Sequence, residues 1–266
     1  MELYIDQKYK KQNLHGEPKA LMINNLKVIY PSNDVPALDI NKLMIKKGER
    51  LAIIGSSGAG KTTLMRTISG EIKPSSGEIR LTYVRRIKGN VGFIYQNFNL
   101  IDRATVYENV LFGRLGKTSA IKSIFGRFSD TDREIAMDAI EEVNLPGKIN
   151  QRTDTLSGGE LQRVAIARVI AQEAEIILAD EPVSNLDPGL AHEILDLIIQ
   201  ISQSHCITLI VNLHQPALAK RYADRIIGLR KGRIVFDNKA SQLTNSVLRD
   251  IYENEFNSSI MFEHKI

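Results

Sequence analysis

The sequence predicts an α/β fold in which a mainly parallel sheet carries a phosphate-binding loop. An apolar run, 51–54, leads directly into the glycine-rich stretch 55–63, and a helix-compatible segment, 64–68, follows it. Strand-like runs alternate with helix-like segments on both sides of this stretch, as they do in parallel sheets. A mostly helical stretch, about 97–172, interrupts the strand-like runs and predicts an inserted α-helical subdomain.

The glycine-rich stretch matches the pattern G-x-x-x-x-G-K-[ST] in the strand-to-helix context that this pattern requires. Its glycines let successive N–H groups converge on phosphate oxygens at the positive end of the next helix. Lys61 is expected to reach the β- and γ-phosphates, Thr62 to ligate Mg²⁺ and Thr63 to bond a phosphate. The alternative is a plain glycine turn. The predicted phosphate-binding residues are Gly55, Ser56, Ser57, Gly58, Ala59, Gly60, Lys61, Thr62 and Thr63. The core is therefore predicted to be that of a phosphate-loop NTPase.

Two strand-like segments, 26–30 and 37–45, stand ahead of the loop, with turn-forming residues at 31–34 between them. Strands joined this closely pair antiparallel, so we expect an antiparallel β flap. Tyr30 lies at the end of the first strand, where its ring can stack on an adenine base. An aromatic residue considered alone more commonly packs in the core or on the surface.

The remaining elements continue the alternation along the chain. Strands are expected at 78–81, 91–95, 176–180, 207–211, 226–229 and 234–236, and helices at 106–112, 135–143, 188–202 and about 241–256. The range 116–130 contains two glycines and several basic residues and indicates a long connection. We expect a tail at 1–20, an ATPase domain at 21–237 that includes the helical subdomain at about 97–172, and a C-terminal helical extension at 238–266.

Composition excludes several classes of protein. Hydrophobic residues make up 43% and charged residues 25% of the 266 residues, as in ordinary soluble domains. The longest apolar runs are strand-sized, far below the roughly 20 residues of a membrane span. The net charge of +4 comes from scattered residues, which favours a solvated surface over a nucleic-acid face. Cys206 is the only cysteine and no signal-peptide pattern is present, so a reducing cytosol is expected.

A pair of carboxylates follows the apolar run 176–179. Asp180 ends that predicted strand, and Glu181 comes next. Beside a phosphate loop, Asp180 is expected to hold Mg²⁺ through its water shell and Glu181 to polarise the attacking water. The alternative interpretation is a helix-capping or simply solvated pair.

The segment Leu156-Ser157-Gly158-Gly159-Glu160 begins another helical stretch. With this segment, the chain resembles the nucleotide-binding subunits of ABC transporters from about residue 21 to 237. The resemblance implies an adenine contact for Tyr30, a Q-loop at Gln96, the signature at 156–160, a D-loop at 184–187 and a switch histidine at His214. It implies that Gln96, Glu181 and His214 act in catalysis and that Thr62, Gln96 and Asp180 bind the metal. The remaining nucleotide contacts that it implies are Ser157, Gly158, Gly159 and Asp187.

The same resemblance implies a head-to-tail homodimer in which the phosphate loop of one subunit and the signature of the other enclose each MgATP. Two transmembrane permease subunits, and indirectly an extracytoplasmic solute-binding protein, are the implied partners, with no nucleic acid. The implied location is the cytoplasmic face of the cell membrane. Gln96, between the core and the helical insertion, is where the nucleotide state is expected to be passed to a membrane partner.

Three of these assignments also have local interpretations. Ser157 and Glu160 form a possible capping box, which is compatible with an anion cradle because the first-turn N–H groups stay available. Asp187 before Pro188 fits a helix N-cap. His214 can simply close the strand at 207–211, whereas the resemblance implies that it contacts the γ-phosphate.

Glu160 departs from the family, which commonly has glutamine at this position of the signature. A carboxylate repels a γ-phosphate, yet near a helix N-terminus it is favoured by about 0.3–1 kcal/mol. We therefore expect Glu160 to fold back as a cap and to point away from the nucleotide.

Among ABC subunits, the chain looks most like the ATPases of phosphonate importers, which are related to those for phosphite. The segments that carry this resemblance are 95–100, 103–106, 113–116, 126–129, 212–215, 222–229 and 234–237. They are less specific than the ATPase motifs, and none is expected to touch the transported solute.

Three other functions remain open at this point. They are an importer for another solute, such as phosphate or polar amino acids, an exporter ATPase, and a soluble ABC-type ATPase of DNA repair or translation. The last would require a long coiled coil or a second cassette, for which the chain has no room. A structural protein that does not hydrolyse ATP is disfavoured by Lys61, Asp180, Glu181 and His214 occurring together.

Overall fold

The computed structural model describes residues 18–31, 35–81, 89–117 and 128–252, and its centre is a six-stranded sheet. The strands occur in the order β5 (Val91–Ile94), β6 (Ile176–Asp180), β7 (Thr208–Asn212), β3 (Arg50–Ile54), β8 (Arg225–Arg230) and β9 (Arg233–Lys239). The first five run parallel, and β9 pairs antiparallel with β8. The predicted parallel core is thus confirmed, with one antiparallel edge strand.

A second sheet is antiparallel and has three strands in the order β2 (Leu38–Lys46), β1 (Lys19–Val28) and β4 (Ser76–Leu81). The predicted flap is confirmed, and β4 joins it as a third strand that sequence patterning did not assign to it. Gly77 has φ +80°, and a Cβ there would lie 2.1 Å from the carbonyl oxygen of Asn25. A glycine is therefore needed where β4 approaches β1.

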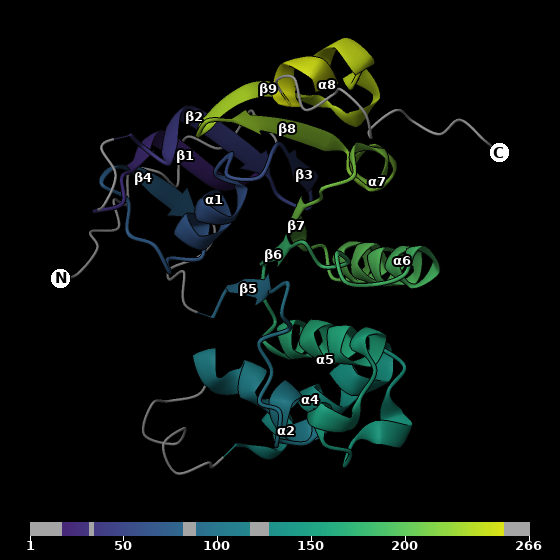
Figure 1. Ribbon diagram of the computed structural model, residues 1–266. Helices are drawn as coiled ribbons and strands as arrows, with labels where there is room; N and C mark the ends of the chain where they lie inside the picture. The colour runs from purple at the N-terminus through teal and green to yellow at the C-terminus, as the bar shows by residue number, and fades with distance from the viewer. Residues whose placement is uncertain (1–17, 32–34, 82–88, 118–127, 253–266) are drawn as a thin grey trace.

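Helices cover the sheets and fill the long stretch between β5 and β6. They are α1 (Lys61–Ile68), α2 (Val106–Leu111), the 3₁₀ turns η2 (Phe112–Gly116), η3 (Pro146–Lys148) and η4 (Thr153–Thr155), α4 (Asp130–Glu142), α5 (Gly158–Ala171), α6 (Pro188–Ser204), α7 (Pro216–Tyr222), η5 (Ala240–Gln242) and α8 (Asn245–Tyr252). In Figure 1, α2, α4 and α5 gather at the bottom of the view, at the opposite end from the antiparallel sheet. The predicted helical subdomain is confirmed.

Two hydrophobic clusters lie on opposite faces of the six-stranded sheet. Leu51 and Ile53 of β3 pack with α1 and the antiparallel sheet, whereas Ala52 and Ile54 face the cluster that includes α5, α6 and α7. This alternation follows the two-residue period of a strand. Because both faces are covered, the interiors of the central strands are apolar, as in the segments 51–54 of β3 and 209–211 of β7.

Several sequence expectations change in detail. Helix α7 was not expected, and α8 begins at Asn245 rather than near residue 241. Most of the connection at 116–130, the greater part of the predicted tail and residues 253–266 lie outside the described residues, so the predicted domain boundaries stay predictions. Among the helices of the described residues, none is both long and apolar enough to cross a membrane.

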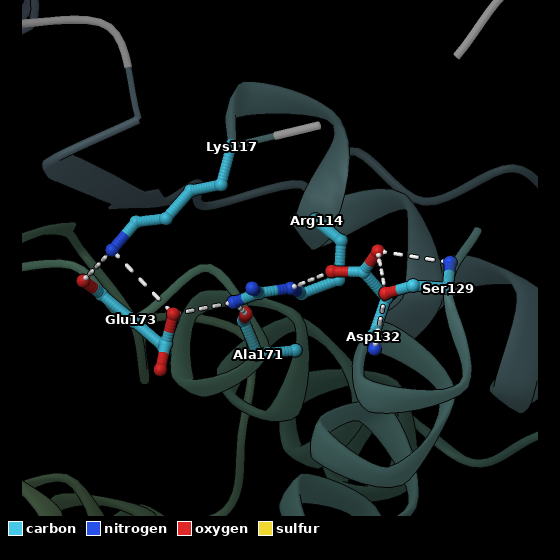
Figure 2. Close-up of polar contacts among 6 residues, drawn as sticks. All are labelled: Arg114, Lys117, Ser129, Asp132, Ala171 and Glu173. Carbon is cyan, nitrogen blue, oxygen red and sulfur yellow. Dashed lines mark hydrogen bonds and ion pairs between the residues drawn. The ribbon is translucent and has the colours of Figure 1, made fainter. Parts of the chain in front are cut away.

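An ion-pair cluster around buried Arg114 and Asp132 joins three parts of the helical subdomain (Figure 2). Nε of Arg114 donates to Asp132 Oδ1 at 2.8 Å, and NH1 donates to the carbonyl of Ala171 at 2.8 Å and to Glu173 Oε2 at 2.7 Å. Lys117 Nζ donates to the carbonyl of Glu173 at 3.0 Å. The cluster therefore ties η2, the start of α4 and the end of α5 together through paired charges, as buried charges require.

Candidate functional site: the ends of the central strands

The phosphate loop leaves β3 at Gly55 and enters α1 at Lys61. Gly55 has φ +148°, and a Cβ there would lie 2.2 Å from the carbonyl oxygen of Leu229. Gly60, the N-cap of α1, has φ +104°, and a Cβ would lie 2.8 Å from the carbonyl oxygen of Ala37. These glycines let the loop fit tightly between β8 and β2.

Lys61 is buried and lies inside the curve of the loop. Its ammonium donates to the carbonyl oxygens of Gly55 at 2.7 Å and Ser56 at 2.9 Å. The amide of Ala59 also donates to Ser56, and Gly232 of the β8–β9 turn donates to the carbonyl of Ala59. The loop therefore curves around the ammonium group of Lys61. Hydrogen bonds within the loop, and one from the β8–β9 turn, hold its shape.

The antiparallel sheet brings Tyr30 to the same helix. The hydroxyl groups of Tyr30 and Thr63 are 3.2 Å apart, within hydrogen-bond distance. The expected adenine-stacking residue therefore stands beside the first turn of α1, next to the phosphate loop. Its contact with an adenine base stays a prediction.

Asp180 contributes a carboxylate to the site from another strand of the sheet. It is the last residue of β6, and its Oδ1 accepts hydrogen bonds from Thr62 Oγ1 at 3.3 Å and Asn212 Nδ2 at 2.7 Å. Thr62 belongs to α1 and Asn212 ends β7. The carboxyl ends of parallel strands meet at one edge of a sheet, which is where open α/β sheets bind ligands. Two of the three predicted metal residues, Thr62 and Asp180, are thus in contact.

Glu181 and His214 form a second pair at this edge. Glu181 has φ +50°, a conformation that non-glycine residues adopt infrequently, and its N–H donates to the carbonyl of Asn212 at 3.2 Å. Nε2 of His214 is hydrogen-bonded to Oε1 of Glu181. The His214 side chain is 49% exposed and that of Glu181 is 15% exposed. A carboxylate held by an accessible imidazole is a geometry that can orient a water molecule and accept its proton.

The signature segment lies at the start of α5, in the helical part of the chain. The Glu160 carboxylate accepts hydrogen bonds from both N and Oγ of Ser157 at 2.9 Å, and it pairs with Lys148. The ammonium of Lys148 and the N–H of Ser157 lower the pKa of Glu160 to about 2. The expected capping role of Glu160 is thereby confirmed, and its orientation relative to a nucleotide stays a prediction.

The signature glycines pack against the segment that follows the carboxylates. A Cβ on Gly159 would lie 2.6 Å from Cδ2 of Leu190 in α6, and one on Gly158 would lie 3.6 Å from Cδ2 of Leu186. Asp187 is the N-cap of α6, where its Oδ1 accepts the N–H of Leu190 at 3.0 Å. Figure 1 shows α1 and α5 in different parts of the molecule, so the chain does not bring its own signature to its phosphate loop.

Gln96 follows β5 and is exposed. The two residues after Asn97, Phe98 and Asn99, have φ of +57° and +51°. Arg168 of α5 donates to both of their carbonyl oxygens, the bond to Phe98 measuring 3.0 Å. The structure thus links the segment after Gln96 to the signature helix, a contact that sequence reasoning missed because the two segments lie 70 positions apart.

A cavity of about 330 Å³ lies beside this link. Its lining includes Phe93 of β5, Tyr95 just after that strand, Asn99, and Arg168 of α5. Tyr95 stacks on Phe93 and donates its hydroxyl to Glu71 Oε1 at 2.7 Å. Burial, together with this hydrogen bond to a carboxylate, raises the pKa of Tyr95 to about 12. Its hydroxyl therefore stays a neutral donor at physiological pH.

A family model described as "ABC transporter" matches residues 38–184, more than half of the chain. The chain belongs to the ABC transporter family. Curated relatives include the phosphonates import ATP-binding protein PhnC of Staphylococcus aureus strains USA300 and NCTC 8325 / PS 47. Each is 44% identical over 238 residues, which cover 86% of this chain and 92% of the relative.

Solved ABC structures share the fold. The ATP-binding cassette MJ0796, in a dimeric post-hydrolysis state bound to ADP and Pi, has a TM-score of 0.71 and 30% identity, covering 83% of this chain and 98% of its own. A putative metal-chelate type ABC transporter in an inward-facing conformation has a TM-score of 0.77 and 30% identity, covering 88% of both chains. The chain is therefore an ABC ATPase, the ATP-hydrolysing subunit of a transporter.

Proposed function

We propose that this ABC ATPase dimerises around two MgATP and thereby drives the import of a phosphonate or a related phosphorus oxyanion. The observation that carries the ATPase part is the convergence of Lys61, Thr62, Asp180, Glu181 and His214 at one edge of the sheet. The solute class is supported by the curated relatives, which are named for phosphonate import and match most of the chain.

The residues at the strand ends fit a nucleotide-bound magnesium ion. Magnesium prefers hard oxygen ligands and is commonly held by one or two protein groups together with phosphate oxygens and water. The Thr62 hydroxyl and the Asp180 carboxylate supply such oxygens and already touch each other. Gln96 is the third residue that the family resemblance assigns to the metal. A bound Mg²⁺ would neutralise charge on the β- and γ-phosphates.

The phosphate loop would hold the triphosphate. The backbone N–H groups of residues 55–63 would bind its oxygens, and Lys61 would add a positive charge that the loop already encloses. Tyr30 would stack on the adenine beside Thr63. The nucleotide would therefore be held at both its base and its phosphates.

Glu181 and His214 would carry the hydrolysis step. Glu181 would accept a proton from the water that attacks the γ-phosphate, and His214 would orient that water and contact the phosphate. The hydrogen bond between them supports this division of roles, because it keeps the carboxylate and the imidazole together at the same edge of the sheet.

Dimerisation would complete each ATP site. The signature residues Ser157, Gly158 and Gly159 begin a helix whose first-turn N–H groups suit an anion, but they lie away from the phosphate loop of the same chain. A second copy in head-to-tail orientation would supply them, together with Asp187. The dimeric state described for the related cassette MJ0796 supports this arrangement.

Two permease subunits would dock at the part of the surface to which a change in the bound nucleotide is transmitted. Exposed Gln96, the link from Arg168 to the segment after it, and the neighbouring 330 Å³ cavity lie together between the parallel core and the helical subdomain. The ATPase would thus act at the cytoplasmic face of the cell membrane, and an extracytoplasmic binding protein would select the solute.

The proposal is tested by ATP hydrolysis of the chain reconstituted with its permease and binding-protein partners. The assay would be titrated with a phosphonate, phosphite, phosphate and an amino-acid mixture, and the Glu181→Gln variant would set the background. Stimulation by phosphonate or phosphite alone is expected. Stimulation by phosphate or amino acids instead would overturn the solute class while leaving the ATPase assignment in place.

A further inference from the structure

Asn212 occupies a position at the strand-end site that the family resemblance does not assign. It is the last residue of β7, and the strand register pairs it directly with Asp180 at the end of β6. Its side chain is fully buried. A buried amide is costly unless its polar atoms are bonded, so its contacts indicate what it does there.

The Asn212 side chain holds one oxygen of Asp180. Nδ2 donates to Oδ1 at 2.7 Å, and the Thr62 hydroxyl donates to the same oxygen at 3.3 Å. An ionised carboxylate only accepts hydrogen bonds, so the amide N–H, and not the amide oxygen, must face Asp180. Within the described residues, both donors to this carboxylate reach Oδ1, and Oδ2 receives none.

The backbone of Asn212 holds the neighbouring carboxylate residue. Its carbonyl accepts the N–H of Glu181 at 3.2 Å, where Glu181 has a left-handed backbone. One residue of β7 therefore contacts both Asp180 and Glu181, through its side chain and its main chain respectively.

The amide oxygen of Asn212 is the unusual feature. It is buried and, among the described residues, has no hydrogen-bond partner. Buried polar atoms in folded proteins are nearly always bonded, to protein or to ordered water. The orientation imposed by Asp180 prevents the amide from turning over to satisfy this oxygen. It is therefore suited to accept a hydrogen bond from a group that arrives with a ligand.

We propose that Asn212 is a positioning residue for the magnesium site. Its N–H and the Thr62 hydroxyl fix Oδ1 of Asp180, which leaves Oδ2 for the hydrated cation, and its amide oxygen accepts a hydrogen bond from a metal-bound water. Thr62 retains its role because a hydroxyl can ligate a metal through its oxygen and still donate its proton. This inference rests on the proposed magnesium site at Thr62 and Asp180.

The test compares Asn212→Leu with the wild-type chain. Leucine has nearly the same volume but cannot hold Asp180 or accept from water. Mn²⁺ affinity would be measured by electron paramagnetic resonance in the presence of adenylyl imidodiphosphate, and nucleotide affinity would be measured separately in EDTA. Loss of groups that orient metal ligands commonly costs about 10–100-fold in metal affinity, so a fall of about tenfold or more is expected. Nucleotide affinity in EDTA should stay within about twofold, since this contact acts through the metal.

Thr208→Val is the matched control. Thr208 is also fully buried in β7, and its hydroxyl accepts the N–H of Gly48 at 3.0 Å at the other end of the strand. This variant removes a buried polar group without touching the site and should leave Mn²⁺ affinity unchanged. If Asn212→Leu does not fold, Asn212→Val provides the same measurement with a residue suited to strands.

Three outcomes would overturn the inference. They are Mn²⁺ affinity unchanged in the Asn212 variant, an equal loss of nucleotide affinity in EDTA, and the same loss of Mn²⁺ affinity in Thr208→Val. If the wild-type nucleotide complex itself binds no Mn²⁺, the proposed magnesium site fails first, and the two failures are thereby distinguished.

Discussion

The strand-end site and the Arg114 cluster are both built from polar side chains, but they differ in what those side chains can do. At the strand ends, Glu181 pairs with a half-exposed histidine, and Asp180 keeps one oxygen without a donor among the described residues. In the helical subdomain, Arg114 is 8% exposed and is surrounded by two carboxylates and a carbonyl. Unsatisfied or accessible polar groups are available to a ligand, whereas fully paired buried charges hold a shape.

The largest expected effect is the loss of ATP turnover in the Glu181→Gln variant. Removing a general base commonly costs about 10²–10⁴-fold in rate, so ATP turnover should fall by that factor while ATP still binds. The ATP-bound dimer should then accumulate and be visible by size-exclusion chromatography. Glu193→Gln is the control, because Glu193 is an exposed carboxylate of α6 that pairs with Arg163 at 3.5 Å. Turnover near that of the wild type would remove Glu181 as the base.

Arg114→Met should affect stability rather than chemistry. Breaking a buried ion pair by removing one partner commonly costs about 3–5 kcal/mol, because it leaves Asp132 buried without its charge partner. Denaturant unfolding measures this loss, and nucleotide affinity of the folded protein should not change. Lys117→Met, at the more exposed edge of the same cluster, should cost only about 0–1 kcal/mol. Equal losses in the two variants would contradict the distinction between buried and exposed pairs.

Gly159→Ala tests the contact between α5 and α6. The added methyl group would lie 2.6 Å from Leu190, so α5 and α6 must move apart or Leu190 must change rotamer. Such overpacking commonly costs about 1–3 kcal/mol in unfolding free energy. Gly147→Ala provides the comparison, because a Cβ at Gly147 meets nothing within 4 Å. A Gly159→Ala chain as stable as the Gly147→Ala chain would show that the glycine is not required for packing.

The smallest effect is expected from Glu160→Gln. At neutral pH it removes a charge at the start of α5 and should lower the free energy of unfolding by about 0.3–1 kcal/mol. The folded-state pKa of Glu160 is lowered to about 2 from an ordinary value of 4.5. Its stabilising contribution is therefore full above that ordinary value and is lost as the pH falls towards 2.

Urea unfolding of the Glu160→Gln and wild-type chains at several pH values measures this difference. The gap between the two chains should close progressively below about pH 4.5, the ordinary value for a glutamate carboxyl. ATP affinity should be equal in the two chains. A tenfold or greater rise in ATP affinity on substitution would contradict the expectation that Glu160 points away from the nucleotide.

Features set by neighbouring residues were predictable. The phosphate loop, the capping of α5 by Glu160 and the N-cap at Asp187 all depend on contacts a few positions apart, and the strand that ends in Asp180 is marked by a run of consecutive apolar residues. Helix α7 is also local, and Pro216 at its first position was a signal that could have revealed it. Asn212 had a signal as well, because it ends an apolar strand just as Asp180 does.

Features set by distant residues were not predictable in the same way. The pairing of β4 with β1 brings together segments about 50 positions apart, and strand periodicity shows which face is buried but not which strand is the partner. The bonds from Arg168 to the carbonyls of Phe98 and Asn99 join a helix to a loop in another part of the chain.

The sequence by itself determined the α/β class, the phosphate loop and the identity of the chemical groups. Hydrophobic periodicity and motif spacing can be read there because they involve residues that are close together in the chain. Only the tertiary structure decided that Asn212 holds both carboxylate residues and that Arg114 is buried among charges. These relations depend on strand order and register, which arise when distant segments bury their apolar faces together.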